Sequence, residues 1–134
     1  MTTLSKIEGI GEKNAAKLQE AGISTLEGLL EKGKTPQGRK ALAEATGISE
    51  KLLLEWVNLA DLFRIKGIGE EYSDLLEEAG VDTVVELAQR NPENLLAKMT
   101  EINEQKKLVR RLPVLSQVQD WVEQAKKLPR VVEY

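Results

Sequence analysis

The chain has 134 residues, of which 31% are charged and 41% hydrophobic, and this size and composition predict a globular protein with one compact core. It contains neither cysteine nor histidine, which excludes disulfides, thiol chemistry, the usual zinc sites and general-base catalysis by histidine. The net charge of −3 counts against strong nucleic-acid binding, because affinity for a phosphate backbone comes mainly from lysine and arginine.

The sequence also bears on location. No apolar stretch approaches the roughly 20 residues that a membrane-spanning helix needs. The first residues have the character of neither a signal nor a transit peptide. We therefore expect a cytoplasmic protein with no membrane contact.

Polar side chains in helix-capping positions divide the first half of the chain into predicted helices. The expected caps are Ser24, Thr35 and Ser49. Gly22 should end the first helix, over residues 12–21, in a left-handed conformation, and Pro36 favours the first position of the third. The second helix should run to about residue 31, the third to about residue 46, and the fourth onward from residue 49 with Leu52 and Trp56 on its apolar face.

The same order of signals returns in the second half, which indicates an internal repeat. Residues 7–29 and 65–87, offset by 58, are identical at 11 of 23 positions. Further along, Asn91-Pro92 corresponds to Thr35-Pro36.

Every predicted element is a helix, and no stretch alternates as a strand does. We expect an all-α fold in which two pseudo-repeats, residues 1–64 and 65–134, pack into one compact helical domain. The second repeat should carry an insertion near residues 109–119, where Pro113 interrupts its last helix.

Each repeat begins with two glycines that flank an isoleucine, Gly9-Ile10-Gly11 and Gly67-Ile68-Gly69. Before a helix, this phrase predicts a tight hairpin that leaves several N-terminal backbone N–H groups without partners, a favourable place for a phosphate. With a small residue four positions on (Ala15, Ser73) and an Ala-Gly-Ile/Val exit, each copy resembles the helix-hairpin-helix motif. The run from residue 41 to 92 is also similar to a bacterial family of tandem helix-hairpin-helix proteins with no assigned function.

The resemblance implies contact with a DNA backbone, without sequence preference, through the hairpin amides. In many members it also implies a monovalent cation held by hairpin carbonyls. The nucleic-acid-binding residues expected here are Gly9, Ile10, Gly11, Lys13, Lys17, Gly67, Ile68 and Gly69.

The two repeats differ in charge. Residues 1–40 hold seven basic and five acidic side chains, whereas residues 65–90 hold two basic and seven acidic ones. Lys13 follows the first hairpin, but Glu71 stands at the same place after the second. We therefore expect any DNA affinity to reside mainly in the first repeat.

Two further features, a basic run and a pair of tryptophans, have a structural and a functional interpretation. The basic run of Lys106, Lys107, Arg110 and Arg111 has i, i+4 spacing and should lie on one side of a helix. It is either a solvated helix face, a second phosphate contact or a site for an acidic partner. Trp56 and Trp121 have apolar neighbours at helical spacing and are expected to be core anchors rather than base-stacking platforms.

We expect no enzymatic activity. The carboxylates lie along helix faces, and neither hairpin is followed by the Gly/Pro-rich segment and catalytic Asp of a helix-hairpin-helix glycosylase. No metal or other cofactor is expected beyond the cation that the resemblance implies. The predicted function is weak, sequence-independent binding of duplex DNA; the alternative is a protein-protein interaction or scaffold module that retains the fold, either as a monomer or as a weak homo-oligomer.

Overall fold

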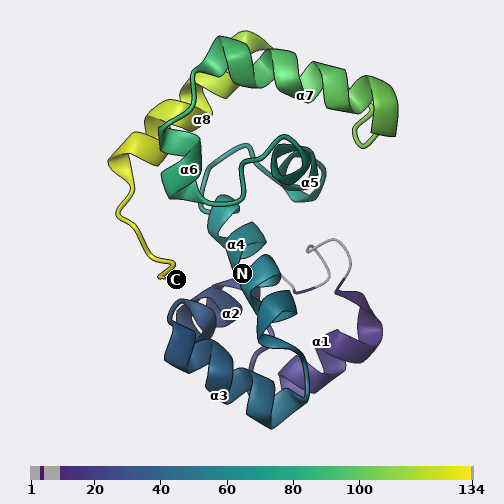
Figure 1. Ribbon diagram of the computed structural model, residues 1–134, viewed down its shortest axis with the longest axis vertical. Coiled ribbons are helices and arrows are strands. Elements are labelled where there is room, and N and C mark those ends of the chain that lie inside the picture. The colour runs from purple at the N-terminus through teal and green to yellow at the C-terminus, as the bar shows by residue number, and fades with distance from the viewer. Residues whose placement is uncertain (1–3, 5–9, 134) are drawn as a thin grey trace. The chain divides into compact units, whose positions relative to one another are not determined.

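The computed structural model describes Leu4 and residues 10–133, and these residues form eight α-helices and no β-strand (Figure 1). The prediction of an all-α fold is confirmed. The chain divides into two compact units. Unit 1 extends to Asp61 and also includes the C-terminal segment from Val131, and unit 2 is Leu62–Arg130. Each helix in this described part is too short or too polar to span a bilayer.

Four helices precede the second Gly-Ile-Gly phrase and four follow it. The first set is α1 (Gly11–Glu20), α2 (Leu26–Gly33), α3 (Pro36–Thr46) and α4 (Glu50–Leu62). The second set is α5 (Glu70–Glu78), α6 (Val84–Ala88), α7 (Pro92–Lys106) and α8 (Leu115–Lys127).

Side-chain caps fix where several of these helices begin. The Thr35 hydroxyl accepts from the Gly38 amide, and the Asn91 side-chain oxygen accepts from the Asn94 amide, both at 3.0 Å, so these two predicted caps are confirmed. The prediction that Ser24 caps α2 is wrong by one residue. Thr25 has the extended backbone of an N-cap, and its hydroxyl accepts from the amide three residues on.

Left-handed glycines end α1 and α5, as predicted. Gly22 has a φ of +88° and Gly80 a φ of +93°, conformations that a side chain with a Cβ adopts only at a cost. In both cases the amide of the following residue donates to a carbonyl five residues back, at 2.8 Å. This pattern satisfies helix-terminal carbonyls and turns the chain sharply.

The core of unit 1 takes fully buried side chains from α1, α2 and α4. They are Leu18, Leu29, Leu53 and Val57. Trp56 is also buried, which confirms it as a core residue. Leu52 does not join them: it is 41% exposed, because α4 turns the face of Leu53 and Val57 to the core instead.

The core of unit 2 surrounds Trp121 on α8. Helices α6 and α7 pack on α8, and α5 packs on α7. Trp121 is 1% exposed within a cluster that includes Leu76, Met99 and Val118. The second tryptophan is therefore also a core anchor, as predicted.

The basic run does not lie on one side of a helix. Helix α7 ends at Lys106, and Lys107 is left-handed with a φ of +51°. Arg110 and Arg111 consequently fall in the non-helical segment before α8. The helix ends early because Val109 turns inward and is buried, held by the side chain of Asn103.

The C-terminal tail is tied to unit 1 by a buried arginine. Arg39 on α3 is 5% exposed, and its guanidinium donates to the carbonyls of Gly33 (2.8 Å) and Glu133 (2.7 Å). The Glu133 amide donates to the Lys34 carbonyl at 2.7 Å, and Val132 is buried. The guanidinium thus joins the α2–α3 junction to a segment 94 residues away in sequence.

Replacing Arg39 by methionine should lower the free energy of unfolding by about 3 kcal/mol, because two charge-assisted bonds are lost and carbonyls in a buried region lose their donor. Urea unfolding of Arg39→Met measures this. Lys40→Met, at the exposed neighbouring position, is the matched control and should change stability by no more than about 0.5 kcal/mol. Equal midpoints for the two variants would contradict the assigned role of Arg39.

Candidate nucleic-acid interface

The first candidate hairpin leads into the N-terminus of α1. Gly9 lies outside the described residues; Ile10 is buried, and Gly11 has a φ of +73°. Lys13 and Lys17 stand one helical turn apart on α1, the former exposed and the latter half-buried. Neither lysine forms an ion pair within the described part of the chain.

The second candidate hairpin is a pair of tight turns between α4 and α5. The Ile65 amide donates to the Leu62 carbonyl at 3.1 Å, and the Ile68 amide donates to the Ile65 carbonyl at 3.2 Å. Gly69 is the extended residue that precedes α5. Ile68 is buried, so its side chain anchors the hairpin and is not available to a ligand.

The side-chain amide of Gln124 holds this hairpin from α8. Its Oε1 accepts from the Lys66 backbone N–H at 2.9 Å, and its Nε2 donates to the Lys66 carbonyl at 3.0 Å. Both polar groups of one residue in the turn are therefore satisfied within unit 2. That backbone N–H is already bound and is not open to a phosphate.

Trp121 lies directly against the same turn. A Cβ added to Gly67, which has a φ of +99°, would lie 2.9 Å from the indole Nε1. The Tyr72 ring on α5 is 5.2 Å from that of Trp121, centroid to centroid, and tilted by 52°. The second hairpin is thus packed onto the core of unit 2 from one side.

The two Gly-Ile-Gly phrases differ in backbone conformation although their sequences are identical. In the first, the last glycine is left-handed, with a φ of +73°. In the second, the corresponding Gly69 is extended, with φ −114° and ψ −162°. The structure places Ile10, Gly11 and Lys13 at the start of α1, Lys17 in its last turn, and Gly67 to Gly69 at the start of α5, with different local geometry.

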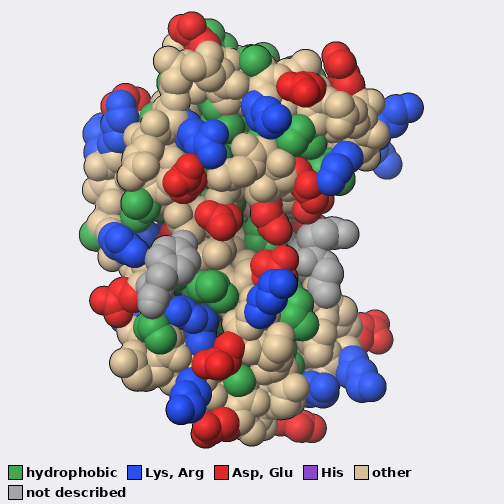
Figure 2. Space-filling model, viewed as in Figure 1, with side chains coloured by type: hydrophobic (Ala, Val, Ile, Leu, Met, Phe, Trp, Pro, Cys, Tyr) green, Lys and Arg blue, Asp and Glu red, His purple; other side chains and the backbone are tan. Residues whose placement is uncertain are grey.

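The charges at the two helix starts also differ. The first turn of α1 contains Glu12 and Lys13 and is followed by Lys17, whereas the first turn of α5 contains Glu70 and Glu71. A negative side chain at a helix N-terminus is favourable for the helix but repels an incoming phosphate. On the face drawn in Figure 2, acidic and basic side chains are mixed rather than separated.

Gln124 is the site residue that sequence reasoning missed. It lies 58 residues from Lys66 and, on its own helix, is one polar side chain among several. The only local hint is its place three residues after Trp121, on the face of α8 that turns toward the core.

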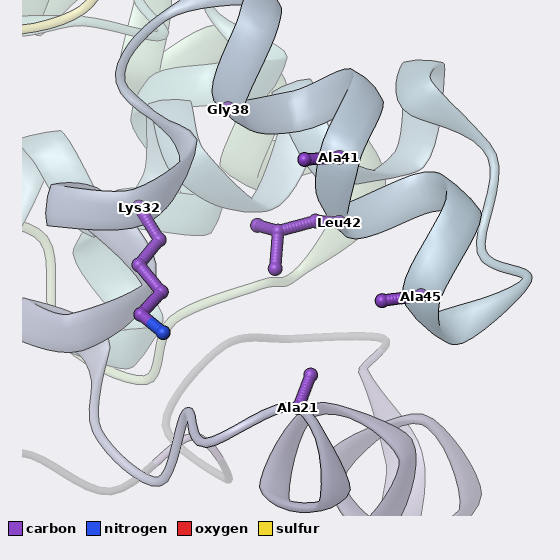
Figure 3. A pocket seen from close by; sticks show the side chains of 6 residues that line it. All are labelled: Ala21, Lys32, Gly38, Ala41, Leu42 and Ala45. Atoms are coloured by element: carbon purple, nitrogen blue, oxygen red, sulfur yellow. The ribbon is translucent and has the colours of Figure 1, made fainter.

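A hollow of about 340 Å³ lies in unit 1 (Figure 3). It is lined by Ala21, Lys32, Gly38, Ala41, Leu42 and Ala45. The Leu42 side chain points into the hollow from α3, and the Lys32 side chain extends along its edge from α2. The lining is apolar apart from the ammonium group of Lys32.

Substituting Gly67 by alanine should destabilise the protein by about 2 kcal/mol or more, because a Cβ is disfavoured at this positive φ and meets the buried indole. Gly69→Ala is the matched control two residues on. Its φ is negative and its added methyl meets nothing within 4 Å, so the loss should stay within about 1 kcal/mol.

Denaturant unfolding followed by tryptophan fluorescence measures both variants. If Gly67→Ala were as stable as Gly69→Ala, the close contact between the hairpin and Trp121 would be wrong.

No curated protein and no solved structure matches this chain significantly. One protein family does match, over residues 8–128, and this segment includes both Gly-Ile-Gly phrases and the eight helices of the described residues. Because the match covers far more than half of the sequence, the chain belongs to the family described as domain of unknown function (DUF4332).

Proposed function

We propose that this protein is a non-catalytic module of the helix-hairpin-helix type that binds duplex DNA weakly and without sequence preference. The contact would use the backbone amides from Gly9 to Lys13, with Lys13 and Lys17 supplying positive charge. Gly9 lies outside the described residues, so the proposed contact rests on the start of α1.

The observation that carries the proposal is the pair of lysines after the first hairpin. Lys13 and Lys17 form no ion pair within the described chain; Lys13 stands in the first turn of α1 and Lys17 one turn further on, in its last turn. A phosphate approaching this helix start meets the positive end of the helix dipole and two ammonium groups. Neutralising phosphates by such side chains is the main source of sequence-independent affinity.

The second hairpin has a different role in this proposal. Its Lys66 and Ile68 amides are already bonded, and Trp121 packs against one side of Gly67. The following turns of α5 carry Glu70, Glu71 and Asp74. We therefore assign unit 2 a structural hairpin and propose the DNA contact for unit 1.

The alternative is a protein-protein interaction module. The net charge of −3 and the acidic start of α5 favour it, because both oppose a polyanion.

Fluorescence anisotropy with a labelled duplex of mixed sequence tests the proposal. Wild type should bind at about 50 mM salt and lose affinity as salt rises. Lys13→Glu combined with Lys17→Glu should abolish binding, because it reverses both charges beside the proposed phosphate site. Glu71→Lys should strengthen binding and increase the log–log salt slope by about 0.9 for each additional phosphate that the protein neutralises.

The matched control is Lys40→Glu with Lys51→Glu, which makes the same change in net charge at exposed positions on α3 and α4. It should reduce affinity far less than the Lys13/Lys17 change. Absence of binding by wild type at low salt, or equal effects of the two double variants, would sink the proposed DNA contact.

A further inference from the structure

The segment between α7 and α8 displays three basic side chains with no acidic partner among the residues that the structure describes. We call residues 107–112 the basic loop. Its Lys107, Arg110 and Arg111 are exposed, and none of them forms an ion pair within the described chain. No acidic residue occurs between Gln105 and Gln119.

The first half of the basic loop is held by Asn103. Its side-chain Oδ1 accepts from the Val109 amide at 3.0 Å, and its Nδ2 donates to the Val109 carbonyl at 3.2 Å. The Val109 side chain is 6% exposed and belongs to the core of unit 2. The Lys107 amide closes the helix end on the Asn103 carbonyl at 2.8 Å.

The second half is held from α5. The Tyr72 hydroxyl donates to the Arg111 carbonyl at 3.0 Å, and the Tyr72 ring packs against Trp121. The loop backbone is therefore fixed on both sides of Arg110. A ligand that binds its cations does not have to order the backbone first, which removes a large entropic cost of binding.

Two neighbours of the basic loop show what distinguishes it. Lys106, the last residue of α7, already pairs with Glu78 at 2.6 Å, so its ammonium group is less available to a ligand than the three cations of the basic loop. Val114 is 52% exposed and is one of two large apolar side chains that the described chain leaves open. Figure 2 shows basic side chains gathered near the end of α7 where this loop begins. The surface thus combines cations with one apolar contact.

We propose that the basic loop is a preformed docking surface for a short acidic segment of a partner protein. Carboxylates of the segment would pair with Arg110, Arg111 and Lys107, and an apolar side chain would cover Val114. Guanidinium groups suit carboxylates because their planar N–H groups can bond both oxygens.

A duplex fits this surface less well than a peptide strand. Tyr72, which holds the loop, stands on α5 directly after Glu70 and Glu71. A duplex spreads its phosphates over a broad face, at one charge per about 1.7 Å of axis, and would meet these carboxylates. A single peptide strand is narrow enough to avoid the Glu70 and Glu71 carboxylates. A phosphate backbone has no apolar group that could pack against Val114.

This surface is independent of the DNA contact proposed for unit 1. The probe for it is a fluorescently labelled peptide rich in glutamate and containing leucine; the same peptide with glutamine replacing glutamate is the ligand control. Wild type should bind the glutamate peptide at low salt and not the glutamine peptide. Arg110→Gln with Arg111→Gln should weaken this binding about tenfold, the scale of two partly desolvated ion pairs.

Lys126→Gln with Lys127→Gln removes the same charge from exposed positions on α8 and should change the affinity by no more than about twofold. Asn103→Ala keeps every charge of the loop but frees its backbone, and should weaken binding about threefold. Thermal melts confirm that each variant is folded.

The proposal is overturned if the glutamine peptide binds as well, if the arginine variant binds like wild type, or if a folded Asn103→Ala protein keeps full affinity. Binding of a labelled duplex that depends on Arg110 and Arg111 more than peptide binding does would identify a nucleic-acid surface instead. The Lys13/Lys17 variant should leave peptide binding unchanged, so failure of one proposal is distinguishable from failure of the other.

Discussion

The indole of Trp121 lies so close to the Gly67 backbone that a Cβ there would approach its Nε1 to 2.9 Å. Much of unit 2 depends on this contact. The same ring packs against Tyr72, whose hydroxyl in turn holds the Arg111 carbonyl, and Gln124, one turn along α8, fixes the Lys66 peptide group. One buried side chain therefore supports the second hairpin, α8 and the basic loop together, and a change there should be felt at all three.

The two Gly-Ile-Gly phrases are identical in sequence but differ in what surrounds them. In unit 2 the Lys66 and Ile68 amides are bonded internally, and the next helix begins with acidic side chains. In unit 1 the next helix carries Lys13 and Lys17. The groups around each Gly-Ile-Gly phrase, rather than the phrase itself, are the reason that we propose a phosphate contact for unit 1 and not for unit 2. This contrast is the basis of the proposed division of roles.

Features fixed by neighbouring residues were predictable from the sequence. The helix caps before Pro36 and Pro92, formed by Thr35 and Asn91, and the left-handed Gly22 depend only on residues close in sequence. Hydrophobic periodicity was sufficient to predict that Trp56 and Trp121 are buried. The cap of α2 was missed because two adjacent hydroxyls, Ser24 and Thr25, both suit the position, and only the backbone conformation decides between them.

Features fixed by distant contacts were not predictable. The i, i+4 spacing of the basic run suggested a helix, but burial of Val109 and its bonds to Asn103 end α7 at Lys106 and put a non-glycine residue in the left-handed region. In the same way, no local sequence pattern predicts that the Gln124 side chain hydrogen-bonds to the Lys66 backbone. Tertiary packing overrides local preference at both places, and both shape the candidate binding surfaces.

An NMR titration of the ¹⁵N-labelled full chain with a short duplex, followed through backbone amide shifts at low salt, separates the two hairpins in one experiment. The proposed division of roles predicts shifts that grow with added duplex at Ile10 to Lys17 and that leave the amides of Lys66 to Tyr72 unmoved. Shifts centred on the second hairpin, or no shifts in either place, would contradict it.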